Sequence, residues 1–154
     1  MIRRFFLLIV LISLLVSCNN DNDQNNQDKD FSSIENPRDR WEAYGITDYM
    51  INERISCFCG GVLQWDLVVK NNIKSEVIFD QTISNQTESE ILERARTIND
   101  VFDFIESIDI NNVASFMVEY NPTYGFPTLV SIDYDLHISD DEIAYIYSEF
   151  NPLD

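Results

Sequence analysis

The stretch LQWDLVVKNNIKSEVIF, residues 63–79, decides the fold class, because it has the pattern of two strands joined by a tight turn. In its first half, apolar residues recur at every second position, as they do when one face of a strand is buried. A two-residue loop would pair Leu67 with Glu76. A three-residue loop, residues 71–73, pairs Leu67 with Val77 instead. Because only the longer loop keeps the apolar faces together, the sequence predicts an antiparallel hairpin with a three-residue loop.

Strand patterns also lie on both sides of this hairpin. Residues 49–59 alternate between two faces, and Glu53 is the one charged residue on the apolar face. Further strands are expected over 113–120 and 127–135. Residues 141–150 also alternate as a last strand would, although a helix is the alternative there.

Start signals predict helices before and between these strands. Asn36-Pro37 combines a capping residue with a first-turn proline and predicts a short helix over 37–44. Capping boxes recur at 87–90 and 97–100, which fits either one long helix or two short ones.

The order of these elements is α-β-β-β-α-β-β-β. Runs of strands joined by short turns, with few helices, predict an α+β fold. We expect a mainly antiparallel sheet of about six strands with the helices packed on one face. The length fits a single domain over residues 36–154.

The first residues, MIRRFFLLIVLISLLVSC, have the pattern of an export signal. Two arginines precede an apolar run, Phe5 to Val16, that is shorter than the roughly 20 residues a membrane-spanning helix needs. The ending Leu-Val-Ser-Cys resembles the lipobox of bacterial lipoproteins, which implies cleavage after Ser17 and lipidation of Cys18. We therefore expect residues 1–17 to be a lipoprotein signal peptide; the alternative is an ordinary cleaved signal with a cysteine nearby.

A polar segment follows this signal. Between Asn19 and Asp30 there is no apolar residue, so this stretch cannot bury enough surface to become ordered. The sequence predicts that residues 18–35 are a disordered Asn/Asp-rich tether. With its lipid on Cys18, the protein would lie in the bacterial cell envelope, periplasmic or surface-exposed, and the outer membrane is favoured.

The charge balance excludes one class of partner. The chain has 10 basic and 27 acidic residues, a net charge of −17, and loss of the signal peptide leaves 8 basic residues and a net charge of −19. Phosphate backbones would repel such a chain, so we expect no nucleic-acid partner.

Two cysteines, Cys57 and Cys59, lie one residue apart near the end of a predicted strand. Alternate residues of a strand are about 6.6 Å apart, at the limit of disulfide reach, although the following Gly60-Gly61 could permit a distorted strand end. An exported protein also meets an oxidising environment. A local disulfide is therefore the leading interpretation; buried free thiols and metal or redox chemistry are the alternatives.

An acidic segment, residues 132–142, surrounds the chain's one histidine, His137. Carboxylate oxygens at this density could bind calcium, although the spacing does not match an EF-hand. A solvent-exposed hairpin turn whose aspartates cap backbone groups is the favoured alternative. The candidate calcium ligands are Asp133, Asp135, Asp140 and Asp141.

Several short motifs, in this order, resemble a bacterial family, domain of unknown function 6174. They are Trp41, Tyr49, SCFC at 56–59, TINDVFDFI at 97–105, YGFPT at 124–128, SID at 131–133 and DDEI at 140–143. The resemblance covers residues 41–150 and implies a domain found in secreted proteins and lipoproteins. It implies no activity.

The sequence favours a membrane-anchored, non-catalytic lipoprotein that binds an unidentified envelope protein or ligand. It indicates no catalytic residue and no cofactor, and leaves enzymatic activity uncertain. The alternative is a calcium-dependent binder or hydrolase that uses the acidic turn around His137.

Overall fold

The computed structural model describes residues 30–60, 63–82, 86–138 and 140–153. Cys18, the predicted signal peptide and most of the predicted tether lie outside these residues. Within the described ranges the elements are α1 (Pro37–Tyr44), β1 (Tyr49–Cys57), β2 (Gln64–Lys70), β3 (Ile73–Ile78), α2 (Glu88–Arg94), α3 (Ile98–Ser107), β4 (Ser115–Tyr120), β5 (Pro127–Asp133) and β6 (Ile143–Pro152). No helix in the described part of the chain has the length and apolar character needed to cross a membrane.

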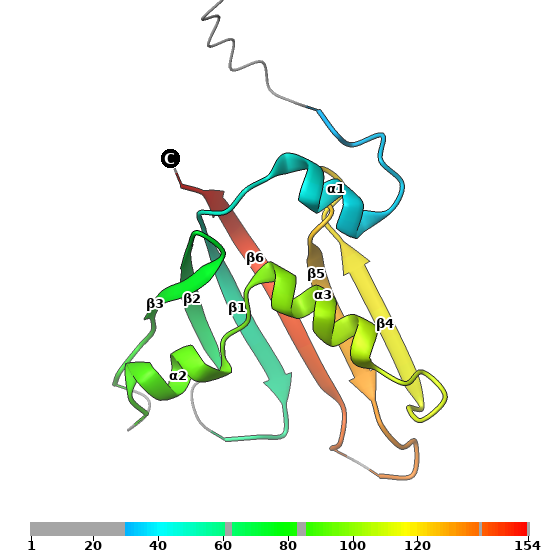
Figure 1. Cartoon of the computed structure of the whole chain (residues 1–154). Helices are drawn as coiled ribbons and strands as arrows, with labels where there is room; N and C mark the ends of the chain where they lie inside the picture. Colours follow the sequence, from blue (N-terminus) through cyan, green and yellow to red (C-terminus); the bar gives the residue numbers. More distant parts are fainter. Residues whose placement is uncertain (1–29, 61–62, 83–85, 139, 154) are drawn as a thin grey trace, which may run out of the picture.

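The strands form one antiparallel sheet in the order β3-β2-β1-β6-β5-β4. Each half is a three-strand meander, and the last strand, β6, returns to pair with β1 at the centre. Figure 1 shows α2 and α3 over the same face of this sheet, with α1 at the end where β1 begins and β6 ends. The predicted α+β fold with an antiparallel sheet of about six strands is confirmed.

The β2–β3 hairpin differs from the prediction in its loop. Its turn consists of two residues, Asn71 and Asn72, both with positive φ (51° and 61°), and Lys70 pairs with Ile73. Leu67 nevertheless pairs with Val77, as predicted. A β-bulge on the way from the turn shifts the register by one residue and brings the apolar faces back together. The three-residue loop was therefore wrong, while the register it was meant to explain was right.

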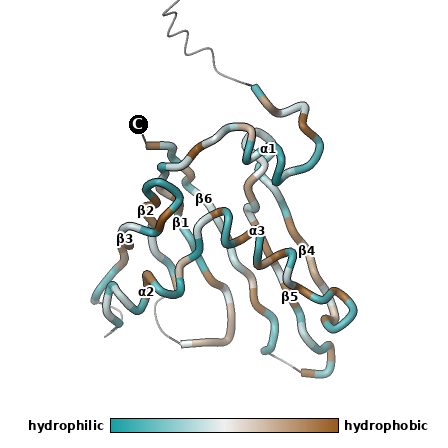
Figure 2. Tube along the Cα trace, viewed as in Figure 1, coloured by the Kyte–Doolittle hydropathy of each residue, from teal (hydrophilic) through white to brown (hydrophobic). Residues whose placement is uncertain are grey.

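The core lies between the sheet and the two helices on its covered face. Both predicted capping boxes are present, and they start two separate helices, α2 and α3. Figure 2 shows brown segments alternating with teal along these helices, as expected for amphipathic helices. The most deeply buried apolar side chains come from both layers: Ile51, Trp65, Leu67, Val69, Ile91, Ile98, Val101, Val130 and Ile132.

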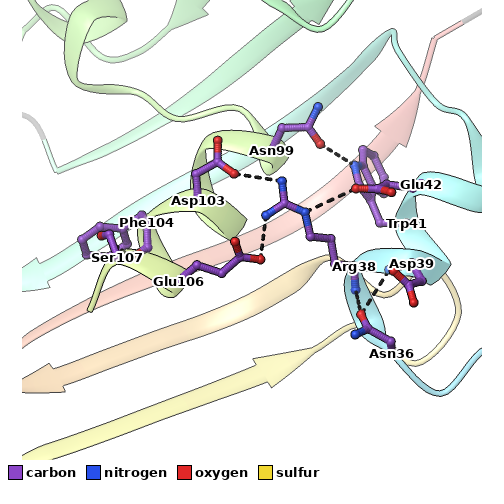
Figure 3. Close-up of polar contacts among 10 residues, drawn as sticks. All are labelled: Asn36, Arg38, Asp39, Trp41, Glu42, Asn99, Asp103, Phe104, Glu106 and Ser107. Atoms are coloured by element: carbon purple, nitrogen blue, oxygen red, sulfur yellow. Dashed lines mark hydrogen bonds and ion pairs between the residues drawn. The ribbon is translucent and has the colours of Figure 1, made fainter. Parts of the chain in front are cut away.

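Helix α1 is attached to the rest of the domain by aromatic packing and by charge. Trp41 contacts Tyr49 and Phe150 in edge-on arrangements and donates from Nε1 to Asn99 on α3 at 3.0 Å. Arg38 binds three carboxylates, two of them on α3 (Figure 3). These contacts hold α1 against β1, β6 and α3.

Contacts with α1 begin before the predicted domain start at Asn36. The Phe31 ring lies edge-on to Tyr44 with ring centroids 5.1 Å apart. The Arg40 guanidinium donates to the Ile34 carbonyl at 2.6 and 2.8 Å. The last residues of the predicted tether therefore pack against the domain.

Candidate functional site

A pocket of about 540 Å³ opens beside the connection between α2 and α3. Arg94 ends α2, and Ala95 and Arg96 form the connection before the cap of α3. The opposite walls come from strands β1, β3 and β6, through Ile55, Lys74, Ile143 and Tyr145. The pocket therefore lies where the helical layer meets the centre of the sheet, a usual place for a ligand site between elements.

Glu53 of β1 is completely buried and contacts the pocket through the backbone of Arg96. Its Oε2 accepts hydrogen bonds from Trp65 Nε1 at 3.0 Å and from the Arg96 backbone N–H at 3.1 Å. Its Oε1 accepts from the Tyr147 hydroxyl at 3.2 Å. A buried carboxyl is tolerated only when its oxygens are satisfied in this way. Glu53 thereby ties three strands to the α2–α3 connection.

Burial and charge shift the proton affinities of this group. Desolvation raises the pKa of Glu53 above its ordinary value, although the three donors and the Arg96 charge oppose that rise. Burial, together with the neighbouring Glu53 carboxyl, also raises the pKa of Tyr147. Tyr147 therefore keeps its proton at neutral pH and donates it to Glu53.

Three cations line the pocket, although the domain is acidic. Lys74 Nζ donates to the carbonyls of Glu93 and Ala95 at 3.1 and 3.0 Å, where it satisfies the C-terminal end of α2. The Arg94 guanidinium lies 5.5 Å from the Trp65 ring centroid. The Arg96 guanidinium lies over two rings, those of Phe104 (4.5 Å) and Tyr145 (4.6 Å). Each cation is thus held in place by groups other than a carboxylate.

The two cysteines lie at the edge of the same region. The structure joins Cys57, at the end of β1, to Cys59, with their Cα atoms 5.2 Å apart in a disulfide. Cys59 contributes to the pocket wall. The strand ends at Cys57 rather than Cys59, which is the distortion that a bridge between these two residues needs.

The acidic turn follows β5, and its aspartates are not gathered around a common point. Asp135 accepts from the His137 backbone N–H at 2.9 Å, which lowers the pKa of Asp135, and contacts His137 Nδ1 at 2.9 Å. One buried oxygen each of Asp133 and Asp141 has no hydrogen-bond partner among the described residues. In the described ranges, no three His, Cys, Asp or Glu side chains are arranged to hold a metal. This holds for Asp140, the remaining candidate ligand, as for the others. Calcium binding here stays a prediction.

The pocket and the buried Glu53 group were missed by sequence reasoning. Glu53 was noted only as a break in an apolar strand face, yet a charged residue at an inward position is itself a signal of a buried polar network. Arg94 and Arg96 lie between the two capping boxes, at the end of one helix and in the short connection before the next, and both are half-buried. Nothing in the local pattern indicates that β1, β3 and β6 meet them there.

The family model described as "Family of unknown function (DUF6174)" matches residues 33–152. This match covers most of the chain, so the chain belongs to that family. No curated protein and no solved structure matches it.

Proposed function

We propose that this member of the DUF6174 family is a membrane-anchored, non-catalytic binding domain of the bacterial cell envelope. The lipid on Cys18 attaches the chain to a membrane, for which the outer membrane is favoured. The pocket beside the α2–α3 connection receives the ligand. The observation that carries the binding role is this pocket, one wall of which is held at the Arg96 backbone by the buried Glu53 carboxyl.

The state of Glu53 supports binding rather than catalysis. A general acid or base must reach the proton it transfers. Glu53 is fully buried, and both of its oxygens accept hydrogen bonds from the protein itself. Its role is to hold the backbone of Arg96, and with it the pocket wall, in a fixed position.

The anchor is supported by the sequence of residues 1–18 and is tested separately from the pocket. Cells that express the full chain are labelled with a radioactive fatty acid, beside cells that express Cys18→Ala. We expect label on the unchanged protein and none on the variant. Equal labelling of the two proteins would overturn the lipid anchor.

The binding role is tested on the mature protein solubilised from native envelopes. Native mass spectrometry should detect a non-covalent ligand that is released on denaturation. Ile143→Trp, at the pocket wall, should lose that ligand. Ile146→Trp is the matched control, because side chains alternate along β6 and Ile146 faces away from the pocket. A ligand retained by Ile143→Trp, or an unliganded wild type, would contradict binding in this pocket.

A further inference from the structure

The distribution of cations on this domain is uneven. The described ranges contain seven of the chain's Lys and Arg residues, and three of them, Lys74, Arg94 and Arg96, line the pocket. A domain with a large excess of acidic residues has many carboxylates available to neutralise its cations. The pocket therefore concentrates positive charge against the trend of the whole chain.

Arg38 shows how this protein treats a cation with a structural role. Its guanidinium binds Glu42, Asp103 and Glu106 at 3.3, 2.8 and 2.7 Å, so its charge is matched by three carboxylates (Figure 3). In contrast, none of the three pocket cations forms an ion pair with a carboxylate of the described residues. Part of the Arg96 charge acts on the buried Glu53 carboxyl, and the rest, with the charges of Lys74 and Arg94, remains available to a ligand.

The same three cations are also positioned in advance. Lys74 is held by two carbonyls, Arg94 by the Trp65 ring and Arg96 by the rings of Phe104 and Tyr145. An arginine that lies over an aromatic ring keeps its N–H groups available for hydrogen bonds to an oxyanion. Positioning of this kind reduces the side-chain conformational entropy that is lost when a ligand binds.

The remaining walls of the pocket favour a ligand that has an apolar part as well as a charged group. Ile55, Ile143 and Tyr145 contribute apolar surface, and the volume falls within the range of small-molecule sites. Glu93 and Asp100 also line the pocket, so an anion must be small enough to lie among the cations without meeting these carboxylates.

We infer that the pocket binds a small organic anion, with a carboxylate or phosphate group between Lys74, Arg94 and Arg96 and an apolar group against Ile55, Ile143 and Tyr145. This inference rests on the proposed function and adds the chemical class of its ligand. Both oxyanions suit guanidinium groups, so the test includes each of them.

The experiment measures binding of four probes to the solubilised mature protein by calorimetry at constant ionic strength: phenyl phosphate, benzoate, inorganic phosphate and neutral phenol. We expect phenyl phosphate or benzoate to bind more tightly than phenol and inorganic phosphate, because only these two carry both groups. Arg94→Gln should weaken that binding at least tenfold. Arg54→Gln is the matched control, because Arg54 is exposed on β1 and points away from the face that carries Glu53 and Ile55.

Each outcome has a distinct meaning. If phenol binds as tightly as the two anions, or if Arg94→Gln leaves the affinity for them unchanged, the inference is wrong. If Arg94→Gln has no effect while Ile143→Trp still removes the native ligand, the proposed binding role stands and only the ligand class fails. If Arg54→Gln weakens binding as much as Arg94→Gln, the effect comes from the overall charge and the pocket is not the anion site.

Discussion

At the scale of single residues, Glu53 is the side chain that links the strands at the centre of the sheet to the helical layer. It lies on an inward position of the central strand and receives hydrogen bonds from β2, β6 and the α2–α3 connection. Such a group is costly to bury but is more costly to leave half-satisfied. It therefore specifies how these elements meet more than it adds to the free energy of unfolding.

Glu53→Gln tests this role through its pH dependence. An amide presents an N–H₂ group toward donors, so we expect a loss of about 1–3 kcal/mol in the free energy of unfolding. Because the folded state raises the pKa of Glu53 above its ordinary value of 4.5, the stability that this group contributes is greatest below that value. That contribution is lost as the pH rises through the raised pKa.

The variant cannot titrate at this position. The difference in unfolding free energy between wild type and Glu53→Gln should therefore shrink from pH 4 toward neutral pH. Urea denaturation at several pH values measures that difference. A difference that grows with pH would mean that the pKa of Glu53 is lowered instead.

At Gly125, a single added methyl group would disturb the packing of the backbone against α1. The φ of Gly125 is +84°, and a Cβ there would collide with the carbonyl oxygen of Pro37 at the start of α1. We expect Gly125→Ala to cost more than about 3 kcal/mol, because backbone strain and the steric clash add. Gly45→Ala is the control: its φ is also positive, at +62°, but no atom lies near its added methyl, so about 1 kcal/mol is expected. Equal losses in thermal melts would contradict the close contact with α1.

The cysteine pair gives a prediction about covalent state. The short Cα separation of 5.2 Å between Cys57 and Cys59 fits a disulfide, and export would oxidise the pair. Thiol titration of the denatured, unreduced mature protein should find no free thiol at these two positions. The reduced protein, titrated in parallel, should yield both thiols. Two free thiols without reduction would exclude the bridge.

At the scale of elements, the helices and strands could be predicted because their signals are local. The capping boxes at Thr87 and Thr97 fixed the starts of α2 and α3, and period-two alternation placed the strands. The hairpin loop could not be predicted, because the bulge in β3 leaves no mark in the apolar pattern. A turn length inferred from register alone fails wherever a bulge compensates for it.

The candidate site could not be predicted for a related reason. Its cations come from β3, the end of α2 and the connection that follows, but its wall is completed by Ile143 and Tyr145 of β6. Strand β6 reaches this place through the β1–β6 pair, which joins strands from opposite ends of the chain. Sequence patterns indicate which face of each element is buried but not which distant elements become neighbours.

The β2–β3 turn tests the element on which the fold assignment began. Asn71 and Asn72 both adopt positive φ, and Asn-Gly is the preferred pair for such a two-residue turn. Asn72→Gly should therefore preserve or raise the unfolding free energy, by up to about 0.5 kcal/mol. Asn72→Val should lower it by about 1–2 kcal/mol, because a β-branched residue resists that backbone. Denaturant midpoints measure both changes, and a Val variant as stable as wild type would contradict the turn.

At the scale of the whole molecule, the dominant feature is charge. The chain carries a net charge of −17, and the fold gathers part of its few cations into one pocket and one ion-pair cluster around Arg38. The rest of the surface is left with an excess of carboxylates. Compaction brings these like charges closer together than they are in the unfolded chain, so repulsion acts against folding.

Salt should therefore stabilise this protein, because added ions screen that repulsion. We expect the melting temperature to rise by several degrees between 10 mM and 300 mM sodium chloride, since the net repulsion outweighs the few surface ion pairs that salt also weakens. A variant in which Glu76, Glu119 and Glu142, three exposed carboxylates, are changed to Gln serves as the control. It should melt at a higher temperature than wild type at low salt and gain less from added salt. A melting temperature that falls with salt, or an equal rise in both proteins, would show that local ion pairs rather than the net charge govern the electrostatic part of stability.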